Sequence, residues 1–203
     1  MRLPYVPDPP NFTSEEDKAV EQRVRQRRGE KGLIALDRTL LHAPPVADGW
    51  NSFLGSIRTK TSLPTSIRET AICRVAVLNK AWYEWESHSP ILESAEALKH
   101  LLTLHQDVTK PQVLAVLNSQ PREPLADLGE KLGAVLAYTD AMTLDVRVPD
   151  SVFEQLKQVG FSEKEIVEIT ATVAAYNCVS RFLVALDVGE RNAQTGPKEG
   201  GKE

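Results

Sequence analysis

The stretch that decides the fold runs from residue 63 to residue 88 and reads LPTSIRETAICRVAVLNKAWYEWESH. Residues 64–78 place apolar side chains around much of a helical circumference, which predicts a buried helix. Asn79 and Lys80 interrupt this pattern, and a second helix is expected from Ala81 into the nineties. Pro90 falls inside that second helix and should kink it. The stretch therefore predicts two consecutive helices, the first of them buried.

The remainder of the chain also shows helical patterns. Helices are expected over about 13–28, 33–42, 46–58, 111–117, 125–143, 148–160 and 162–186, because apolar residues recur at helical spacing between Pro and Gly breaks. Alternating polar and apolar residues, the pattern of a strand, are not convincing anywhere in the sequence. We therefore predict an all-α fold.

We expect three regions in the chain: an N-terminal extension with a helix (1–32), a main domain (33–188) and a flexible tail rich in Gly, Lys and Glu (189–203). The main domain divides into a motif-bearing half, about 46–120, and a second half, about 125–188. The second half contains a segment similar to one in the first, since Glu168 follows a helix start as Glu69 does. This similarity is either a degenerate internal repeat or a chance match. A repeat would place Ser180, Leu183 and Asp187 at the positions that correspond to Ala81, Glu84 and His88.

Composition excludes several classes of partner. The 203 residues have a net charge of −4, with 41% hydrophobic and 26% charged residues, and no basic stripe, so nucleic acid is a poor candidate. No run of 18 apolar residues and no secretory signal is present, which favours a cytoplasmic protein without a membrane span. Cys73 and Cys178 lie in apolar helical patterns and are expected to be buried free thiols.

Three residues form the candidate catalytic group. Glu84 and His88 are four residues apart and share a helix face, so the carboxylate could raise the pKa of the imidazole and suit it to acid–base work. A surface Glu–His pair is the alternative. Glu69 lies on the preceding apolar helix, where a carboxylate needs a partner. It would either orient His88 or form a structural ion pair with one of three arginines, namely Arg68, Arg74 or Arg181.

Four further residues are candidates for substrate binding. Trp82, Tyr83 and Trp85 are concentrated in one helix, and they could wall a pocket for a flat organic acid or lactone, or simply pack in the core. Arg181 could bind a substrate carboxylate, although an interhelical salt bridge is the favoured interpretation. Paired Cys motifs and H-E-x-x-H are absent, and we expect neither a metal nor a cofactor.

The spacing E-x11-A-x2-E-x3-H of Glu69, Ala81, Glu84 and His88 resembles the carboxymuconolactone decarboxylase/alkylhydroperoxidase D superfamily, whose peroxidase branch reads E-x11-C-x2-C-x3-H. The resemblance implies an all-α fold of helical hairpins and a homo-oligomer with sites near subunit contacts. Glu and His at the last two positions also look like the lactone-decarboxylase branch. That branch implies loss of CO₂ from a carboxylated lactone and protonation of the resulting dienolate.

Three functions follow from this resemblance. The first is a cofactor-free enzyme acting on a small carboxylated lactone or carbonyl compound, with His88 as proton donor and acceptor, Glu84 as its orienter or second base, and Glu69 in support. The second is a thiol peroxidase relative, which Ala81 and Glu84 disfavour because they stand at the cysteine positions. The third is a non-catalytic oligomeric binding protein.

Overall fold

All regular structure in the computed structural model, which describes residues 1–95, 109–123 and 128–197, is helical. The prediction of an all-α fold is confirmed. A 3₁₀ turn at Gly29–Lys31 follows the first helix. The α-helices are α1 (Glu15–Arg28), α2 (Ala35–Leu40), α3 (Pro44–Thr59), α4 (Thr65–Leu78), α5 (Trp82–Ser94), α6 (Lys110–Asn118), α7 (Glu130–Leu144), α8 (Asp150–Gln158) and α9 (Glu163–Leu186).

Local sequence signals set several of these boundaries. The capping box of α9 pairs the Ser162 side chain with the backbone N–H of Glu165, and the Glu165 carboxylate with the backbone N–H of Ser162. Pro44 opens α3, where a missing N–H removes no helical hydrogen bond. The helix α5 does not end at Pro90 but continues to Ser94. The break at Asn79 and Lys80 separates α4 from α5 as the sequence predicts.

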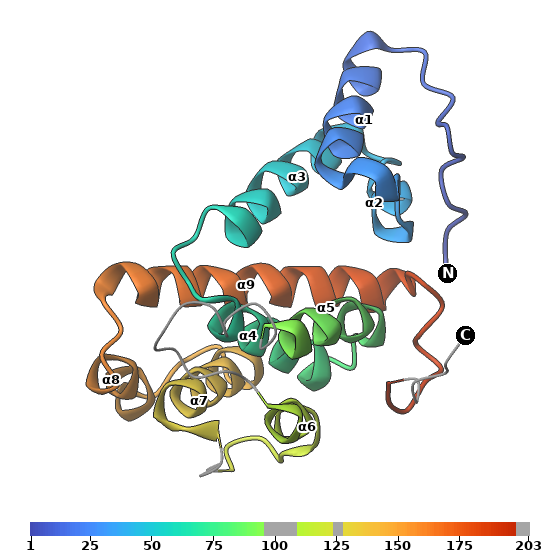
Figure 1. Cartoon of the computed structure of the whole chain (residues 1–203). Helices are drawn as coiled ribbons and strands as arrows, with labels where there is room; N and C mark the ends of the chain where they lie inside the picture. Colours follow the sequence, from blue (N-terminus) through green and yellow to red (C-terminus); the bar gives the residue numbers. More distant parts are fainter. Residues whose placement is uncertain (96–108, 124–127, 198–203) are drawn as a thin grey trace.

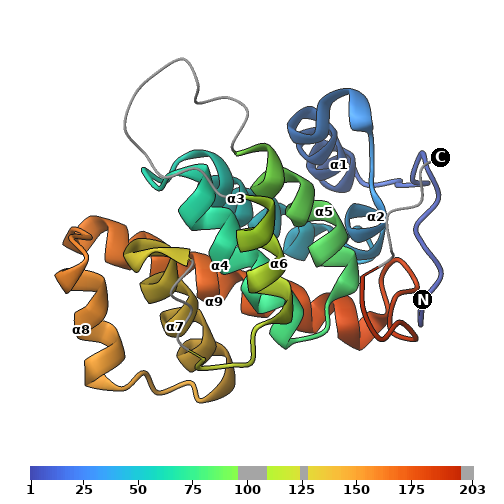
Figure 2. The ribbon, with the colours of Figure 1, turned by 60° about the horizontal axis from the view of Figure 1, so that its bottom comes forward.

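The long helix α9 crosses the middle of the molecule (Figure 1). The helices α1, α2 and α3 lie on one side of it, and α4 to α8 lie on the other. The rotated view brings the side of α4 to α8 toward the viewer (Figure 2). By length and composition α9 could cross a membrane, but core helices pass the same test. Ile169, Val173 and Tyr176 of α9 are fully buried in the hydrophobic core, so packing explains its apolar character.

The helix α4 is buried on nearly every face because it packs against α5, α7 and α9. Its Arg74 is fully buried and donates from Nε and Nη2 to Asp140 of α7 at 2.5 and 2.9 Å. The remaining Nη1 atom donates to the backbone carbonyls of Val116 and Ser119, at the end of α6. A buried charge needs such complete pairing, and this pairing ties three helices together.

Two expectations differ from the structure. Cys73 is buried as expected, but Cys178 is exposed because it lies on the outward side of α9. Residues 189–197 were expected to belong to a flexible tail, yet they contact α5. Arg191 pairs with Glu86 at 2.9 Å, and the indole N–H of Trp82 donates to the carbonyl of Gln194 at 3.0 Å. These polar contacts hold a segment whose composition alone suggested no packing; residues 198–203 lie outside the described part of the chain.

Candidate active site

The hairpin of α4 and α5 brings Glu69 and His88 together. The Nδ1 atom of His88 lies 2.7 Å from Oε2 of Glu69, and both side chains are buried. The other carboxylate oxygen of Glu69 accepts from Nε of Arg68 at 3.2 Å. Both alternatives for Glu69 therefore occur at once, since it holds His88 and also pairs with Arg68. Arg74 and Arg181 do not take part in this pairing.

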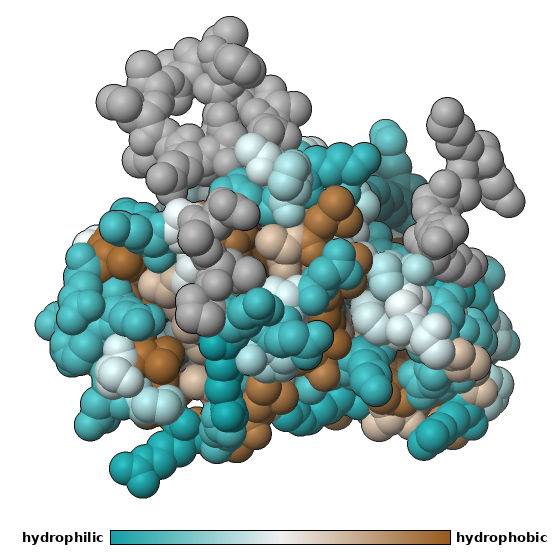
Figure 3. All heavy atoms as spheres, turned by 90° about the horizontal axis from the view of Figure 1, so that it is seen from below, coloured by the Kyte–Doolittle hydropathy of each residue, from teal (hydrophilic) through white to brown (hydrophobic). Residues whose placement is uncertain are grey.

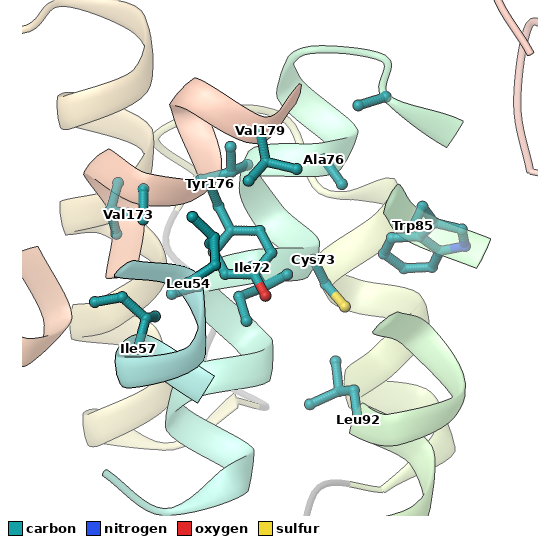
Figure 4. Packing of buried hydrophobic residues seen from close by; sticks show 14 of the residues in the cluster. Leu54, Ile57, Ile72, Cys73, Ala76, Trp85, Leu92, Val173, Tyr176 and Val179 are labelled. Carbon is teal, nitrogen blue, oxygen red and sulfur yellow. The ribbon is translucent and has the colours of Figure 1, made fainter. Parts of the chain in front are cut away.

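The other ring nitrogen of His88, Nε2, connects the pair to residues on two further helices, α9 and α3. Nε2 of His88 lies 3.3 Å from the hydroxyl of Tyr176 on α9, and Nε of Arg58 on α3 donates to that hydroxyl at 2.7 Å. The His88 and Tyr176 rings meet edge to face, with centroids 5.1 Å apart. Figure 4 shows Tyr176 reaching from α9 into a cluster that includes Leu54 of α3 and Ile72 of α4.

The chemistry of these groups fixes the direction of the hydrogen bonds. The Glu69 carboxylate can only accept, so Nδ1 of His88 carries a proton and donates it to that carboxylate. In the neutral imidazole Nε2 then carries no proton and accepts from the Tyr176 hydroxyl, whose oxygen accepts from Arg58. The chain Arg58–Tyr176–His88–Glu69 therefore holds a neutral imidazole in one tautomer.

The electrostatics of the site favour that neutral form. Burial lowers the pKa of His88 below its usual range; the hydrogen bond and charge of Glu69 oppose this, and Arg58 and Arg68 add to the lowering. Burial raises the pKa of Tyr176, against the effect of Arg58. At neutral pH the pair is therefore an uncharged imidazole facing an uncharged phenol.

Glu84 lies one turn before His88 on α5, but it does not act as the partner of the imidazole. Only 2% of the residue is exposed, and neither carboxyl oxygen has a hydrogen-bond partner among the described residues. Burial raises its pKa well above the usual range, with Arg58 opposing. The expectation that Glu84 orients His88 and raises its pKa is therefore replaced: Glu69 makes that contact, and Glu84 is a buried neutral acid.

The aromatic residues of α5 differ in their surroundings. Trp82 and Trp85 are almost fully buried in the core, and Trp85 lies at the edge of the cluster in Figure 4. Tyr83 is half-buried against Gly189, where a Cβ atom would lie only 2.2 Å from the Tyr83 ring. Arg181 is exposed and bonds only to Asn177 on its own helix, so the favoured interhelical salt bridge does not form within the described part of the chain.

Glu69, Glu84 and His88 are buried in this structure. Two cavities, of about 610 and 550 Å³, lie elsewhere, the first between α7 and α8 and the second where α4, α7 and α9 begin. Neither is lined by Glu69, Glu84 or His88, so the expected pocket walled by α5 aromatics is not one of these cavities. Among the described residues, no group of three or more His, Cys, Asp or Glu side chains is arranged to hold a metal ion.

Two members of the site were not identified from the sequence. The sequence places Tyr176 in an apolar helix. Its position on the core face of α9 was the signal that could have identified it. Arg58 stands at the end of α3, and only the three-dimensional packing of α3 on α9 shows that it reaches the site.

Comparison with known proteins identifies the fold. No protein-family model matches the sequence, and no curated protein is similar to it. An uncharacterised peroxidase-related protein from Ralstonia eutropha JMP134, described as an alkylhydroperoxidase AhpD core, superposes with a TM-score of 0.66 at 18% identity, covering 92% of this chain and 90% of that chain. A peroxidase-related protein from Silicibacter sp. TM1040 gives 0.66 at 15%, covering 94% and 95%. The debrominase Bmp8 gives 0.64 at 19%, covering 86% and 85%.

Proposed function

We propose that this protein, whose fold is that of the alkylhydroperoxidase D-like proteins, is a cofactor-free enzyme that transfers protons on a small carboxylated lactone or carbonyl compound. The fold alone does not choose a reaction, because its structural neighbours include both peroxidase-related proteins and a debrominase. The observation that carries the proposal is the difference between two carboxyl groups. Glu69 accepts from His88 and Arg68, whereas Glu84 is buried with no hydrogen-bond partner among the described residues, and burial raises its pKa. Two carboxyl groups in such different environments suit different roles in acid–base chemistry.

The roles follow from these environments. In a decarboxylation, the bond to the carboxylate breaks, CO₂ leaves, and the electron pair passes into the conjugated carbonyl to give an enolate. Glu84 then donates its proton to the carbon, so that one proton is consumed per turnover. His88, held by Glu69, supplies a neutral imidazole that can take up the replacement proton from water at Nε2 and return it to Glu84 after each turnover. The aromatic side chains and Arg181 remain candidates for substrate contact.

A thiol peroxidase is the second candidate, because two structural neighbours are described as peroxidase-related. A peroxidase needs a thiolate that attacks the peroxide. Burial, followed by the charges of Glu69 and Glu84, raises the pKa of the Cys73 thiol well above its usual range. Ala81 and Glu84 hold the positions of the motif cysteines, so the acid–base function is better supported.

The experiment is a screen of the purified protein with γ-lactone carboxylates and β-keto acids, with release of CO₂ as the signal. A hit should lose about 10²- to 10⁴-fold in kcat in His88→Ala, the usual scale for loss of a general acid or base. Circular dichroism of the variant checks that the fold is retained. A screen without turnover, or a hit that His88→Ala leaves unchanged, would favour the third possibility, a binding protein with this fold.

A further inference from the structure

Arg58 has unused binding capacity beside the candidate site. Its Nε donates to Tyr176, and its Cζ lies 5.6 Å from the centre of the Tyr176 ring. The two Nη atoms make no hydrogen bond or salt bridge within the described part of the chain, and the side chain is only half-buried. Every other arginine near the site has an acceptor for its charge: Arg68 has Glu69, and Arg27 and Arg28 share Asp37.

The surroundings of Arg58 favour an anion. Burial, followed by the nearby charges of Arg28 and Arg58, lowers the pKa of Arg27 to about 10, against the effect of Asp37. Asp37 pairs with Arg27 and Arg28, and no carboxylate among the described residues pairs with Arg58, so positive charge is in excess beside Tyr176. A bound anion would offset this repulsion, and a planar guanidinium suits a carboxylate because two parallel N–H groups can bind it.

We propose that Arg58 binds a carboxylate of the substrate through its Nη atoms, and so places the substrate at the outer end of the chain Arg58–Tyr176–His88–Glu69. This inference rests on the proposed function, because it assigns a binding role within the same site. A cation stabilises a carboxylate more than it stabilises neutral CO₂, so Arg58 suits a carboxylate that the reaction leaves intact. Through Arg58, the helices α1 to α3 thereby contribute to recognition of the substrate.

Binding of two matched probes tests the assignment without requiring turnover. The probes are 5-oxotetrahydrofuran-2-carboxylate, a γ-lactone with one carboxylate, and its neutral carboxamide, each titrated into the full chain by calorimetry. The wild-type protein should bind the carboxylate more tightly than the amide. Arg58→Gln should weaken carboxylate binding by about 10- to 100-fold, the range expected for losing hydrogen bonds to a charged group, and should leave amide binding unchanged.

Two further variants make the test specific. Arg58→Lys keeps the charge without the fork of donors and should give an intermediate loss, and it serves if Arg58→Gln is poorly folded. Arg23→Gln removes an exposed arginine of α1 that pairs with Asp48, and it should bind as the wild type does. Equal binding of carboxylate and amide by the wild type, or equal carboxylate binding by Arg58→Gln, would overturn the inference.

The same measurements separate this inference from the proposed function. Carboxylate binding that depends on Arg58, together with a screen that finds no turnover, would support the binding role and refute the enzyme. Turnover that depends on His88 but not on Arg58, together with equal binding of both probes, would support the enzyme and refute the binding role of Arg58.

Discussion

The imidazole of His88 takes its carboxylate from Glu69 on the neighbouring helix, at 2.7 Å, and not from Glu84 one turn away on its own helix. This relationship divides two carboxyl groups into an acceptor that orients the ring and a buried acid that has no partner among the described residues. The proposed proton chemistry depends on this difference between Glu69 and Glu84.

Replacing Glu69 should change the titration of His88. The hydrogen bond and charge of Glu69 raise the His88 pKa against the effect of burial, so Glu69→Gln should lower the His88 pKa further. The ring signals of His88, followed by NMR against pH, measure this directly. Glu84→Gln is the contrasting variant, and a larger shift in it than in Glu69→Gln would contradict the assignment of partners.

Replacing Glu84 should change how stability depends on pH. The folded protein keeps a proton on Glu84 that the unfolded chain releases near the ordinary pKa of 4.5. Unfolding then releases a proton, so the free energy of unfolding of the wild type falls as pH rises above that value. Glu84→Gln lacks this dependence, and its stability relative to the wild type should grow by up to about 1.4 kcal/mol per pH unit.

Urea unfolding at pH 5 and pH 8 provides the measurement. Glu93→Gln, at an exposed position of the same helix, is the control and should follow the wild type. If Glu84→Gln and the wild type differ by the same amount at both pH values, Glu84 is ionised in the folded protein and cannot be the proposed acid.

The protein should not reduce organic hydroperoxides. Cys73 is buried with a raised thiol pKa, and no cysteine stands at the two motif positions. Peroxide consumption with a dithiol reductant should therefore match the buffer blank. Turnover that disappears in Cys73→Ser or Cys178→Ser would revive the peroxidase function.

The protein should be a homo-oligomer in solution. Its exposed apolar side chains include Val46 and Phe53 of α3, which are 54% and 50% exposed. The face on the side of α6 to α8 carries hydrophobic residues in separate places among hydrophilic ones (Figure 3). Burial of the α3 side chains between copies would remove apolar surface from water. Light scattering should show a mass above 22.5 kDa that falls in Phe53→Glu; a monomeric wild type would refute the expectation.

The helices were predictable from the sequence because their signals are local. The break after Leu78 and the capping box at Ser162 place the boundaries of α4, α5 and α9 within about a residue. The wide apolar pattern of α4 predicted burial, and its own neighbours α5, α7 and α9 provide that burial. Because α4 is covered within one chain, the apolar surface available for contacts between copies is that of α3, with Val46 and Phe53 exposed.

The site was predictable only in part, because its partners come from different helices. Spacing on one helix suggested a pair of Glu84 and His88, but whether such neighbours bond depends on which side chain the next helix presents. Glu69 on α4 makes the hydrogen bond to His88, and Tyr176 and Arg58 belong to α9 and α3. Periodicity does not report such long-range packing.

Proton delivery to carbon tests the central claim most directly. A substrate from the screen is converted in D₂O, and deuterium at the carbon that loses the carboxylate is measured by NMR. The account predicts one deuterium per CO₂ released in the wild type, with a rate about 10²- to 10⁴-fold lower in Glu84→Gln. An unchanged rate of deuterium incorporation in Glu84→Gln would contradict the account, because the buried acid would then not be the proton donor.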